Sequence, residues 1–386
     1  MNSSGSFSPE SEPGSPAQSA QSPLAGAAVE GAARLLGIDL LPDPADFKSI
    51  LVVKPSSLGD IVHAVPTVAL LARAYPQLRL RWLVRPEFAP LLHGLPMIHE
   101  LVLFPRAEFG GFGGIWRAIK WSRQLRQGRE QGPEMILDLQ GLLRSGLLSR
   151  ARARRGSGDV VVGLSDAREG ARWFHQHRVA VDSNAHAVAR QLAAARALGA
   201  AVPDDEFDLS WPLAEAALPQ WWPDCLRAER GNYVVLHPYS RGLGKALDQE
   251  SIGQLMDALT GVTVVVVGQR PGVIGFECSD RVIDATNRTS LPELVAILRG
   301  AKGVISVDSG PAHLAAAVCP GRVISIHSRA HPRQVGPWRA DAKAWFRGAL
   351  APMKGWLTSG GGVVEDGELR MPSQEELRRI AAGVLG

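Results

Sequence analysis

Asp60 has the position in this sequence that most suggests chemistry. The apolar run 50–53 is typical of a buried parallel strand, and Pro55 and Gly59 interrupt it before apolar residues recur at helical intervals. Asp60 therefore falls where a strand gives way to a helix, which is where open α/β sheets bind their ligands. Its carboxylate can cap the helix, or it can act as a general base toward a substrate hydroxyl. On these residues alone the cap is the favoured interpretation, because aspartate is a common helix cap.

The glycine-rich loop 237–245 is a first candidate for binding phosphate. It follows an apolar strand, and its small residues let the backbone approach a ligand closely. Ser240 supplies a hydroxyl and Lys245 supplies a point charge, a combination that suits a diphosphate. The alternative is an ordinary glycine-rich loop with an exposed lysine, and the loop alone does not decide between the two.

The segment 307–313 is a second candidate. Ser309 and Gly310 come just before a helix whose opening proline suits the first turn. Free backbone N–H groups and the helix dipole favour an anion at such a start. Asp308 ends the strand and can orient a sugar or a lysine, while His313 can face the same ligand. A capped helix with a half-buried histidine is the alternative, but the two loops together favour a phosphate ligand more than either does alone.

Several signatures of other enzyme classes are absent from the sequence. No Walker A motif is present, no G-x-G-x-x-G follows a strand, and no paired acids or His/Cys cluster suggest a metal site. We therefore expect no cofactor and no metal ion. The three cysteines, Cys225, Cys278 and Cys319, lie far apart and predict no disulfide framework, as in a reducing compartment.

Composition predicts a two-domain globular protein with an uneven charge distribution. The chain has 386 residues, of which 45% are hydrophobic and 21% charged. It has no apolar stretch long enough to span a bilayer and no visible secretory signal, so we expect a cytoplasmic location. The net charge is only +4, but basic residues heavily outnumber acids over 117–190. This excess indicates an anionic partner, with a solvated arginine-rich face as the alternative.

Strands and helices alternate in two series, which predicts two parallel sheets covered on both faces. The first series has strands at 50–53, 79–84, 100–104, 135–139 and 160–164, with helices at 143–152 and 186–198. The Pro- and Trp-rich segment 211–223 connects it to the second. The second has strands at 233–237, 263–267, 282–284, 303–307 and 323–327, and helices at 248–259, 291–299, 312–318 and 373–384.

These patterns predict an α/β protein with two Rossmann-like domains facing across a cleft. We expect a disordered or linker extension at 1–46, an N-terminal domain at 47–222, a C-terminal domain at 223–372 and a closing helix at 373–386. Within the extension, 1–24 is predicted to be disordered and 25–38 to form a short helix.

The segment 109–126 mixes aromatic and basic residues. Such a segment can lie on a membrane surface or hold an acidic glycolipid. The alternative is an amphipathic helix that packs Trp116 and Ile119 inward, and the sequence favours neither.

Five segments together resemble a known family. They are VVKPSSLGDIVHAVP, DLQGLLRSGL, AREGARWF, HAVARQ and SVDSGPAHLAAA. In this order they are similar to the lipopolysaccharide heptosyltransferases of glycosyltransferase family 9, over about residues 48 to 345. The heptosyltransferase I type looks nearest, partly because of the triplet 167–169. The resemblance implies a GT-B fold, inversion at the anomeric carbon, no metal, and a C-terminal helix that packs back on the N-terminal domain.

The resemblance also assigns expected roles. Asp60 matches the general base, which makes the base the favoured interpretation of this residue. The donor-binding residues expected in the C-terminal domain are Ser240, Lys245, Asp308, Ser309, Gly310 and His313. The acceptor-binding residues expected in the N-terminal domain are Ser57, Gly59, Arg144 and Arg168.

The sequence departs from the family at two places. Where the family often has a glutamate for the ribose, this chain has 269–272, and Glu277 is the nearest acid. Ala246 and Leu247 follow Lys245 where a tryptophan is more usual. The identities of the nucleobase and of the sugar in the donor therefore stay open.

The expected function is an inverting, metal-independent transfer of a heptose-like sugar from an ADP-sugar to an anionic lipid-linked saccharide. The expected partners are an ADP-heptose-like donor and an anionic glycolipid acceptor, with peripheral contact to the cytoplasmic face of the inner membrane. One alternative is a non-catalytic sugar-nucleotide-binding protein on the same fold, and another is a family 9 enzyme with a different donor or acceptor. Nucleic-acid binding ranks low, because the basic region contains no recognised reading motif.

Overall fold

The computed structural model describes residues 41–127, 131–228, 231–240, 242, 244–269, 281–358 and 368–386. Several predictions lie outside these ranges: the disordered stretch 1–24, the helix 25–38, Cys278, and all but Gln269 of the expected ribose loop with its neighbour Glu277.

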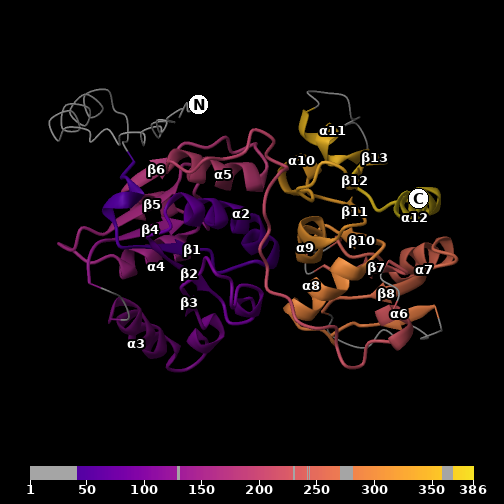
Figure 1. The fold of residues 1–386 in the computed structure, drawn as a ribbon, viewed down its shortest axis with the longest axis horizontal. Helices are drawn as coiled ribbons and strands as arrows, with labels where there is room; N and C mark the ends of the chain where they lie inside the picture. The colour runs from indigo at the N-terminus through magenta and orange to yellow at the C-terminus, as the bar shows by residue number, and fades with distance from the viewer. Residues whose placement is uncertain are drawn as a thin grey trace, which may run out of the picture. The chain divides into compact units, whose positions relative to one another are not determined.

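The first sheet has six parallel strands in the order β3-β2-β1-β4-β5-β6 (Figure 1). The strands are β1 (Ser49–Val53), β2 (Arg79–Val84), β3 (Glu100–Leu103), β4 (Glu134–Asp138), β5 (Val160–Leu164) and β6 (His177–Val179). This is the strand order of a Rossmann fold, which reverses direction between β1 and β4. The carboxyl ends of these two strands are therefore the expected place for a ligand.

Helices cover both faces of the first sheet because every residue of β1 is apolar or small and buried. Ile50 and Val52 belong to the core with α2 (Leu58–Ala74) and α5 (Ala187–Ala197). Leu51 and Val53 point to the opposite face, where α3 (Gly114–Gln127) and α4 (Leu143–Arg152) lie. Alternation along one strand thus assigns one core to each face. Short 3-10 turns, η1 (Pro44–Asp46), η2 (Ala89–Leu91), η3 (Arg106–Phe109) and η4 (Ala171–Phe174), complete this half.

The second sheet repeats the same order and adds an edge. Its order is β13-β12-β11-β10-β7-β8-β9, in which all pairs are parallel except β12 with β13. Its strands are β7 (Tyr233–His237), β8 (Thr263–Val266), β9 (Val282–Asp284), β10 (Gly303–Val307), β11 (Arg322–His327), β12 (Lys343–Phe346) and β13 (Ala349–Pro352). The helices are α6 (Asp224–Ala228), α7 (Gln249–Ala258), α8 (Leu291–Gly300), α9 (Gly310–Val318), α10 (Pro332–Val335), α11 (Met353–Thr358) and α12 (Gln374–Leu385). The α/β prediction of two Rossmann-like halves is confirmed.

The segment before α6 touches both halves. The N–H of Ala214 donates to the carbonyl of Leu91 at 2.8 Å, and that of Ala216 donates to Pro292 at 3.3 Å. These contacts fit the expected connection, while the domain boundaries themselves stay a prediction.

The C-terminal helix corrects one prediction. Within the described residues, α12 packs on strands β10 and β11 of the second sheet and on the neighbouring helix α7, not on the N-terminal domain. Its apolar stripe, Leu377, Ile380 and Val384, is fully buried in the core of that half. A Cβ added to Gly303 would lie 2.3 Å from Val384 Cγ2, so a glycine in β10 lets the helix approach this sheet closely.

α3 bears on one of the two interpretations that the sequence leaves open for 109–126, the inward packing of Trp116 and Ile119. Trp116 is 73% exposed and Ile119 is also exposed, so neither packs inward. Trp121 and Leu125 make the inner face instead, and Trp121 Nε1 donates to the carbonyl of Leu103 at 3.0 Å. Among the described residues, no helix has the length and apolarity that a membrane span requires.

Candidate active site

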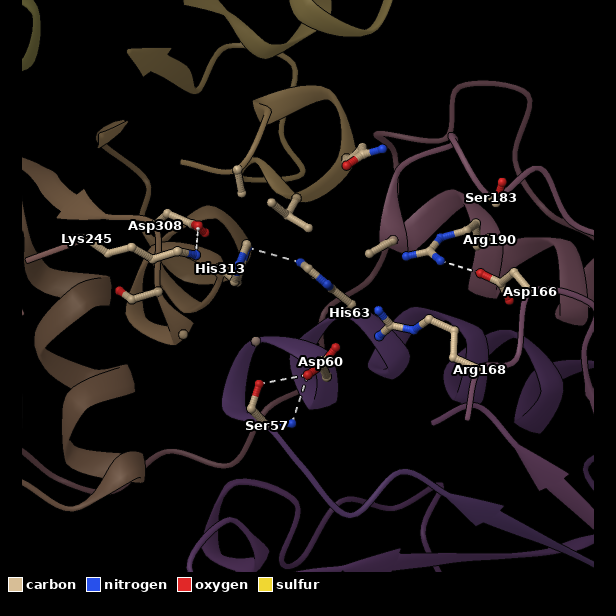
Figure 2. Close-up of a pocket in the computed structure, with 17 residues that line it drawn as sticks. Ser57, Asp60, His63, Asp166, Arg168, Ser183, Arg190, Lys245, Asp308 and His313 are labelled. Carbon is tan, nitrogen blue, oxygen red and sulfur yellow. Dashed lines mark hydrogen bonds and ion pairs between the residues drawn. The ribbon is translucent and has the colours of Figure 1, made fainter. Parts of the chain in front are cut away.

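A cavity of about 550 Å3 lies where loops of the two halves meet (Figure 2). Most of the residues expected at the site line it: Ser57, Gly59, Asp60, Arg168, Lys245, Asp308, Ser309, Gly310 and His313. They follow β1, β5, β7 and β10, so four strand ends supply the walls. Both switch points of the two sheets thus open into one cavity.

Asp60 is the third residue of α2 and completes the capping box at the start of this helix. Ser57 is the N-cap residue, and Asp60 Oδ2 accepts hydrogen bonds from the Ser57 N–H at 2.9 Å and from its hydroxyl at 2.7 Å. Asp60 is therefore the third helical residue of a capping box and not the cap itself. Its other oxygen, Oδ1, receives no hydrogen bond from the described residues. The side chain is 42% exposed, so Oδ1 remains available to a ligand.

A buried lysine controls the charge of Asp60. Lys54 Nζ lies 3.9 Å from Asp60 Oδ1 and donates to the carbonyl of Leu139 at 2.7 Å. Burial raises the pKa of Asp60, but the Lys54 charge and the hydrogen bonds from Ser57 outweigh it, and the net pKa is below the ordinary value. Burial likewise lowers the pKa of Lys54, against the nearby carboxylates. Asp60 is consequently ionised at neutral pH and can accept a proton.

Lys245 faces the cavity from the other half. Its Nζ donates to Asp308 Oδ2 at 2.5 Å. Burial raises the pKa of Asp308, but the His327 charge and the hydrogen bond from Lys245 outweigh it, so the net pKa is lowered. The carboxylate therefore stays charged and holds the lysine at the edge of the cavity.

At the start of α9, Pro311 has no N–H and the Ala312 N–H donates to the Ser309 carbonyl at 3.1 Å, so the Gly310 N–H is the first-turn donor that remains for a ligand. Ser309 is the N-cap residue, yet its side chain makes no capping hydrogen bond within the described part of the chain. Its hydroxyl instead donates to the carbonyl of Val307 at 3.0 Å and lies 3.1 Å from His237 Nδ1. The positive end of the helix dipole thus faces the cavity without a side-chain acceptor, which is the arrangement of an anion site.

Two glycines let α2 and α9 meet at their starts. A Cβ added to Gly59 would lie 2.6 Å from His313 Cδ2, and one added to Gly310 would lie 2.7 Å from Leu58 Cβ. Both distances are shorter than side chains allow, so these glycines are needed for the contact. Gly59 and Gly310 therefore act through close packing at the mouth of the cavity.

The family match decides the identity. The protein-family model described as "Glycosyltransferase family 9 (heptosyltransferase)" matches residues 120–354 of this sequence. The chain belongs to glycosyltransferase family 9. It is accordingly a glycosyltransferase, as the five sequence segments predict.

Curated relatives cover most of this chain, and solved structures share its fold. Lipopolysaccharide heptosyltransferase 1 of Pseudomonas aeruginosa is 27% identical over 296 residues, covering 70% of this chain and 76% of the relative. Lipopolysaccharide heptosyltransferase 3 of Escherichia coli is 25% identical, covering 76% and 87%. E. coli heptosyltransferase WaaC with ADP superposes with a TM-score of 0.61 at 21% identity, over 87% of this chain and 99% of that one. A family 9 glycosyltransferase from Veillonella parvula gives 0.65 at 18% identity, over 88% and 97%. These two structures share the GT-B fold.

Two expected residues of the family 9 site do not line the cavity. The Ser240 hydroxyl accepts from the Gly242 N–H at 3.3 Å, and Ser240 is not among the lining residues. Arg144 is exposed outside the cavity, where its charge lowers the pKa of Arg106. Arg85 contributes to the same effect, whereas Glu87, which is ion-paired with Arg85, opposes it.

Arg168 lines the cavity because a buried network fixes its loop. Asp138 accepts from the N–H groups of Gln140 and Gly141 at 2.9 and 3.0 Å. The Arg168 N–H in turn donates to the carbonyl of Gly141 at 2.8 Å. Strand β4 thereby sets the position of a cation that follows β5.

Four functional candidates are missing from the sequence-based set: Lys54, His63, Asp166 and Arg190. Arg190 is paired with Asp166 and lies on the same side of the cavity as Arg168 in Figure 2. His63 lies three residues after Asp60, so helical spacing would have placed it on the same face. In the described ranges, no group of three or more His, Cys, Asp or Glu residues is arranged to hold a metal ion.

Proposed function

We propose that this family 9 glycosyltransferase moves a heptose-like sugar from an ADP-sugar to an anionic, lipid-linked saccharide, with inversion and without a metal ion. One observation carries the proposal. The Asp60 carboxylate lies in the same cavity as Lys245 and the start of α9. The names of the relatives, lipopolysaccharide heptosyltransferases, support the choice of sugar and acceptor. A solved structure of WaaC with ADP-2-deoxy-2-fluoro heptose supports the nucleotide, since it has the same fold.

The donor side suits a diphosphate leaving group. As the bond from the anomeric carbon to the diphosphate oxygen breaks, negative charge develops on that oxygen. Lys245, the Gly310 N–H and the positive end of the α9 dipole are placed to stabilise this charge before the reaction begins. A divalent cation does this work in other enzymes, and a fixed ammonium with a helix dipole can supply the same kind of stabilisation.

Asp60 is the base in this scheme. The oxygen Oδ1, which does not bond to Ser57, takes the proton from the acceptor hydroxyl while the hydroxyl oxygen forms a bond to the anomeric carbon. Attack from the face opposite the leaving diphosphate inverts the configuration. Arg168 and Arg190 line the same cavity and suit an acceptor that carries carboxylate or phosphate groups.

Asp60→Asn tests the base. Asparagine keeps an oxygen that can accept from Ser57, so the helix start is retained while the basicity is lost. We expect the rate of sugar transfer to fall by about 10³-fold, whereas ADP binding measured by calorimetry stays close to that of the wild type.

Glu293→Gln is the matched control, because Glu293 closes the same kind of capping box with Ser290 at the start of α8 and does not line the cavity. Its transfer rate should not change. Equal turnover by Asp60→Asn would remove the proposed base. ADP binding without ADP release for any acceptor would instead favour a non-catalytic binding protein.

We propose further that the lipid part of the acceptor approaches over α3, α4 and η4, which pack against one another. Phe112 is fully exposed beside α3, Trp116 is 73% exposed and Trp173 on η4 is 79% exposed. The exposed arginines Arg106 and Arg144 add positive charge in the first half, while Arg85 is paired with Glu87. Exposed aromatic rings next to cations are typical of contact with an anionic membrane surface.

Flotation with vesicles tests this surface. The wild type should bind vesicles that contain phosphatidylglycerol and should not bind pure phosphatidylcholine. Phe112→Ser with Trp116→Ser should weaken the binding about tenfold, because two exposed aromatic side chains are lost. Leu369→Ser, at an exposed apolar residue on the segment before α12, is the control. Unchanged binding by the double variant would overturn the assignment of the surface.

A further inference from the structure

His63 and His313 form a hydrogen bond that joins the two halves. His63 lies on α2 and His313 on α9, and 3.0 Å separates His63 Nε2 from His313 Nδ1 (Figure 2). Both side chains are buried, and their ring planes are 69° apart. The distance fits an N–H···N bond, but it does not say which nitrogen donates.

The other nitrogen of His63 indicates the direction. His63 Nδ1 is buried and has no hydrogen-bond partner among the described residues. If the proton were on Nδ1, a buried N–H would have no acceptor. If it is on Nε2, the N–H donates to His313 and only a lone pair is left unpaired. Buried N–H groups without an acceptor are rarer than acceptors with a spare lone pair, so the second arrangement is favoured.

The surroundings of His313 favour the same direction. Burial lowers the pKa of both histidines, so each ring is neutral and carries one N–H. If His313 Nδ1 accepts from His63, its own proton must be on Nε2. The negative charges of Asp308 and Asp60 act on His313 and attract an N–H while they repel a lone pair, and the smaller effect of the Lys245 charge opposes them.

We propose that His63 is a positioning residue that holds His313 as the Nε2–H tautomer, so that His313 presents an N–H donor at the cavity. The Nε2 edge of the ring lies beside the start of α2, since a Cβ on Gly59 would be 3.2 Å from this nitrogen. His313 Nε2 makes no hydrogen bond to any residue in the described ranges, while the side chain lines the cavity. The donor is thus left for a ligand oxygen.

The consequence for catalysis rests on the proposed function. An N–H at this point can bind an oxygen of the leaving diphosphate, whereas a lone pair would repel it. In this scheme His63 does not contact the diphosphate itself but acts through its hydrogen bond to His313. A residue of the acceptor half thereby sets the hydrogen-bonding character of a residue of the donor half.

Two substitutions separate the hydrogen bond from the volume of the side chain. His63→Gln keeps an N–H donor at a similar reach, and His63→Met fills a similar space without a donor. We expect two-bond 1H–15N spectra of the full chain, labelled with 15N-histidine, to show His313 as the Nε2–H tautomer in the wild type and in His63→Gln. In His63→Met the Nδ1–H form should become populated. The signals of His313 are identified by their loss in His313→Gln.

His186 provides an internal reference for these spectra. Its Nε2 lies 2.9 Å from the carbonyl of Gly336, and its Nδ1 accepts from the Val188 N–H at 3.1 Å, which fixes the Nε2–H tautomer. His313 in the wild type should match this pattern. An Nδ1–H signature for His313, or identical spectra for the wild type and His63→Met, would overturn the proposal.

Kinetics with ADP-heptose add a second readout. His63→Met should lower kcat about tenfold with a smaller change in the KM for the donor, and His63→Gln should restore most of the rate. A loss of rate that His63→Gln does not restore would count against the tautomer. The spectra need no substrate, so they decide the tautomer even if the wild type does not use ADP-heptose, a result that would contradict only the proposed donor.

Discussion

At the scale of single residues, the Lys54 charge lowers the pKa of Asp60, the proposed base, and so keeps it ionised and weakly basic. A methionine at position 54 has a similar length but no charge. Without the ammonium, the effect of burial on Asp60 is opposed only by the hydrogen bonds from Ser57 and by His313, so the pKa of Asp60 should rise. Because the base must be unprotonated, the acidic limb of the kcat/KM profile should move to higher pH in Lys54→Met.

In the wild type this limb should lie below pH 3.8, the ordinary pKa of aspartate. Lys48→Met is the control, since Lys48 is exposed at the other end of β1. A limb that stays in place in Lys54→Met would mean that the lysine does not act on the base.

Some site residues could be predicted from the sequence and others could not. Asp60, Lys245 and Asp308 follow recognisable strands, and strand ends meet in a parallel sheet. Ser240 belongs to a predicted phosphate loop, yet its side chain bonds within that loop. The direction of a loop side chain depends on backbone angles that sequence patterns do not give. Arg144 was expected at the cavity from the family resemblance alone, and its place on α4 turns it to the surface.

At the scale of secondary-structure elements, Glu376 fastens the start of α12. It accepts from the Ser373 N–H at 2.6 Å and from the Arg370 guanidinium at 2.6 and 2.8 Å. The hydrogen bond from Arg370 is the main cause that lowers the pKa of Glu376 to about 2 from 4.5. A depressed pKa means that the carboxylate stabilises the fold above pH 4.5, and that this contribution is lost as the pH falls toward 2.

Glu376→Gln should lower the free energy of unfolding by about 1 kcal/mol at pH 7, because it removes a charged cap. The difference from the wild type should shrink at pH values near 2. Urea unfolding at both pH values measures this, with Glu375→Gln as the exposed neighbour for comparison. A difference that is as large at low pH as at pH 7 would contradict the assignment.

The elements that could be predicted are those with a long apolar signal. Strands β2, β5, β7, β9 and β10 occupy the predicted ranges, since each has a run of mostly apolar residues. β6, β12 and β13, which are three or four residues long, were missed; β9 is as short but was predicted, so length alone does not account for the misses. The inner face of α3 stayed open in the sequence because apolar residues occur on two sides of this helix, and only the packing selects Trp121 and Leu125.

At the scale of the whole molecule, the contact between α2 and α9 sets the distance between Asp60, the proposed base, and the proposed donor site. Gly59→Ala would place a methyl group 2.6 Å from the His313 ring, so the helices must move apart. Alanine is otherwise the better helix former, so the helix itself should not suffer. We expect kcat to fall at least about tenfold, because small displacements of reacting groups are costly, while the melting temperature changes little.

Gly253→Ala on α7 is the control, since nothing lies within 4 Å of its added Cβ. It should leave kcat unchanged and raise the stability by up to about 1 kcal/mol. Gly310→Ala should act like Gly59→Ala, because its Cβ would meet Leu58. Wild-type turnover in both glycine variants of the contact would show that the two halves need not approach so closely.

The packing of α12 on the second sheet has one more consequence, which concerns deletion of the C-terminal residues. Ile305 and Ile324 pack under this helix, and β10, the strand that carries Ile305, leads directly into Asp308 and the proposed diphosphate site. Deleting residues 373–386, which include α12, would expose that side of β10 to solvent. Affinity for the nucleotide should then decline even though none of the deleted residues lines its cavity.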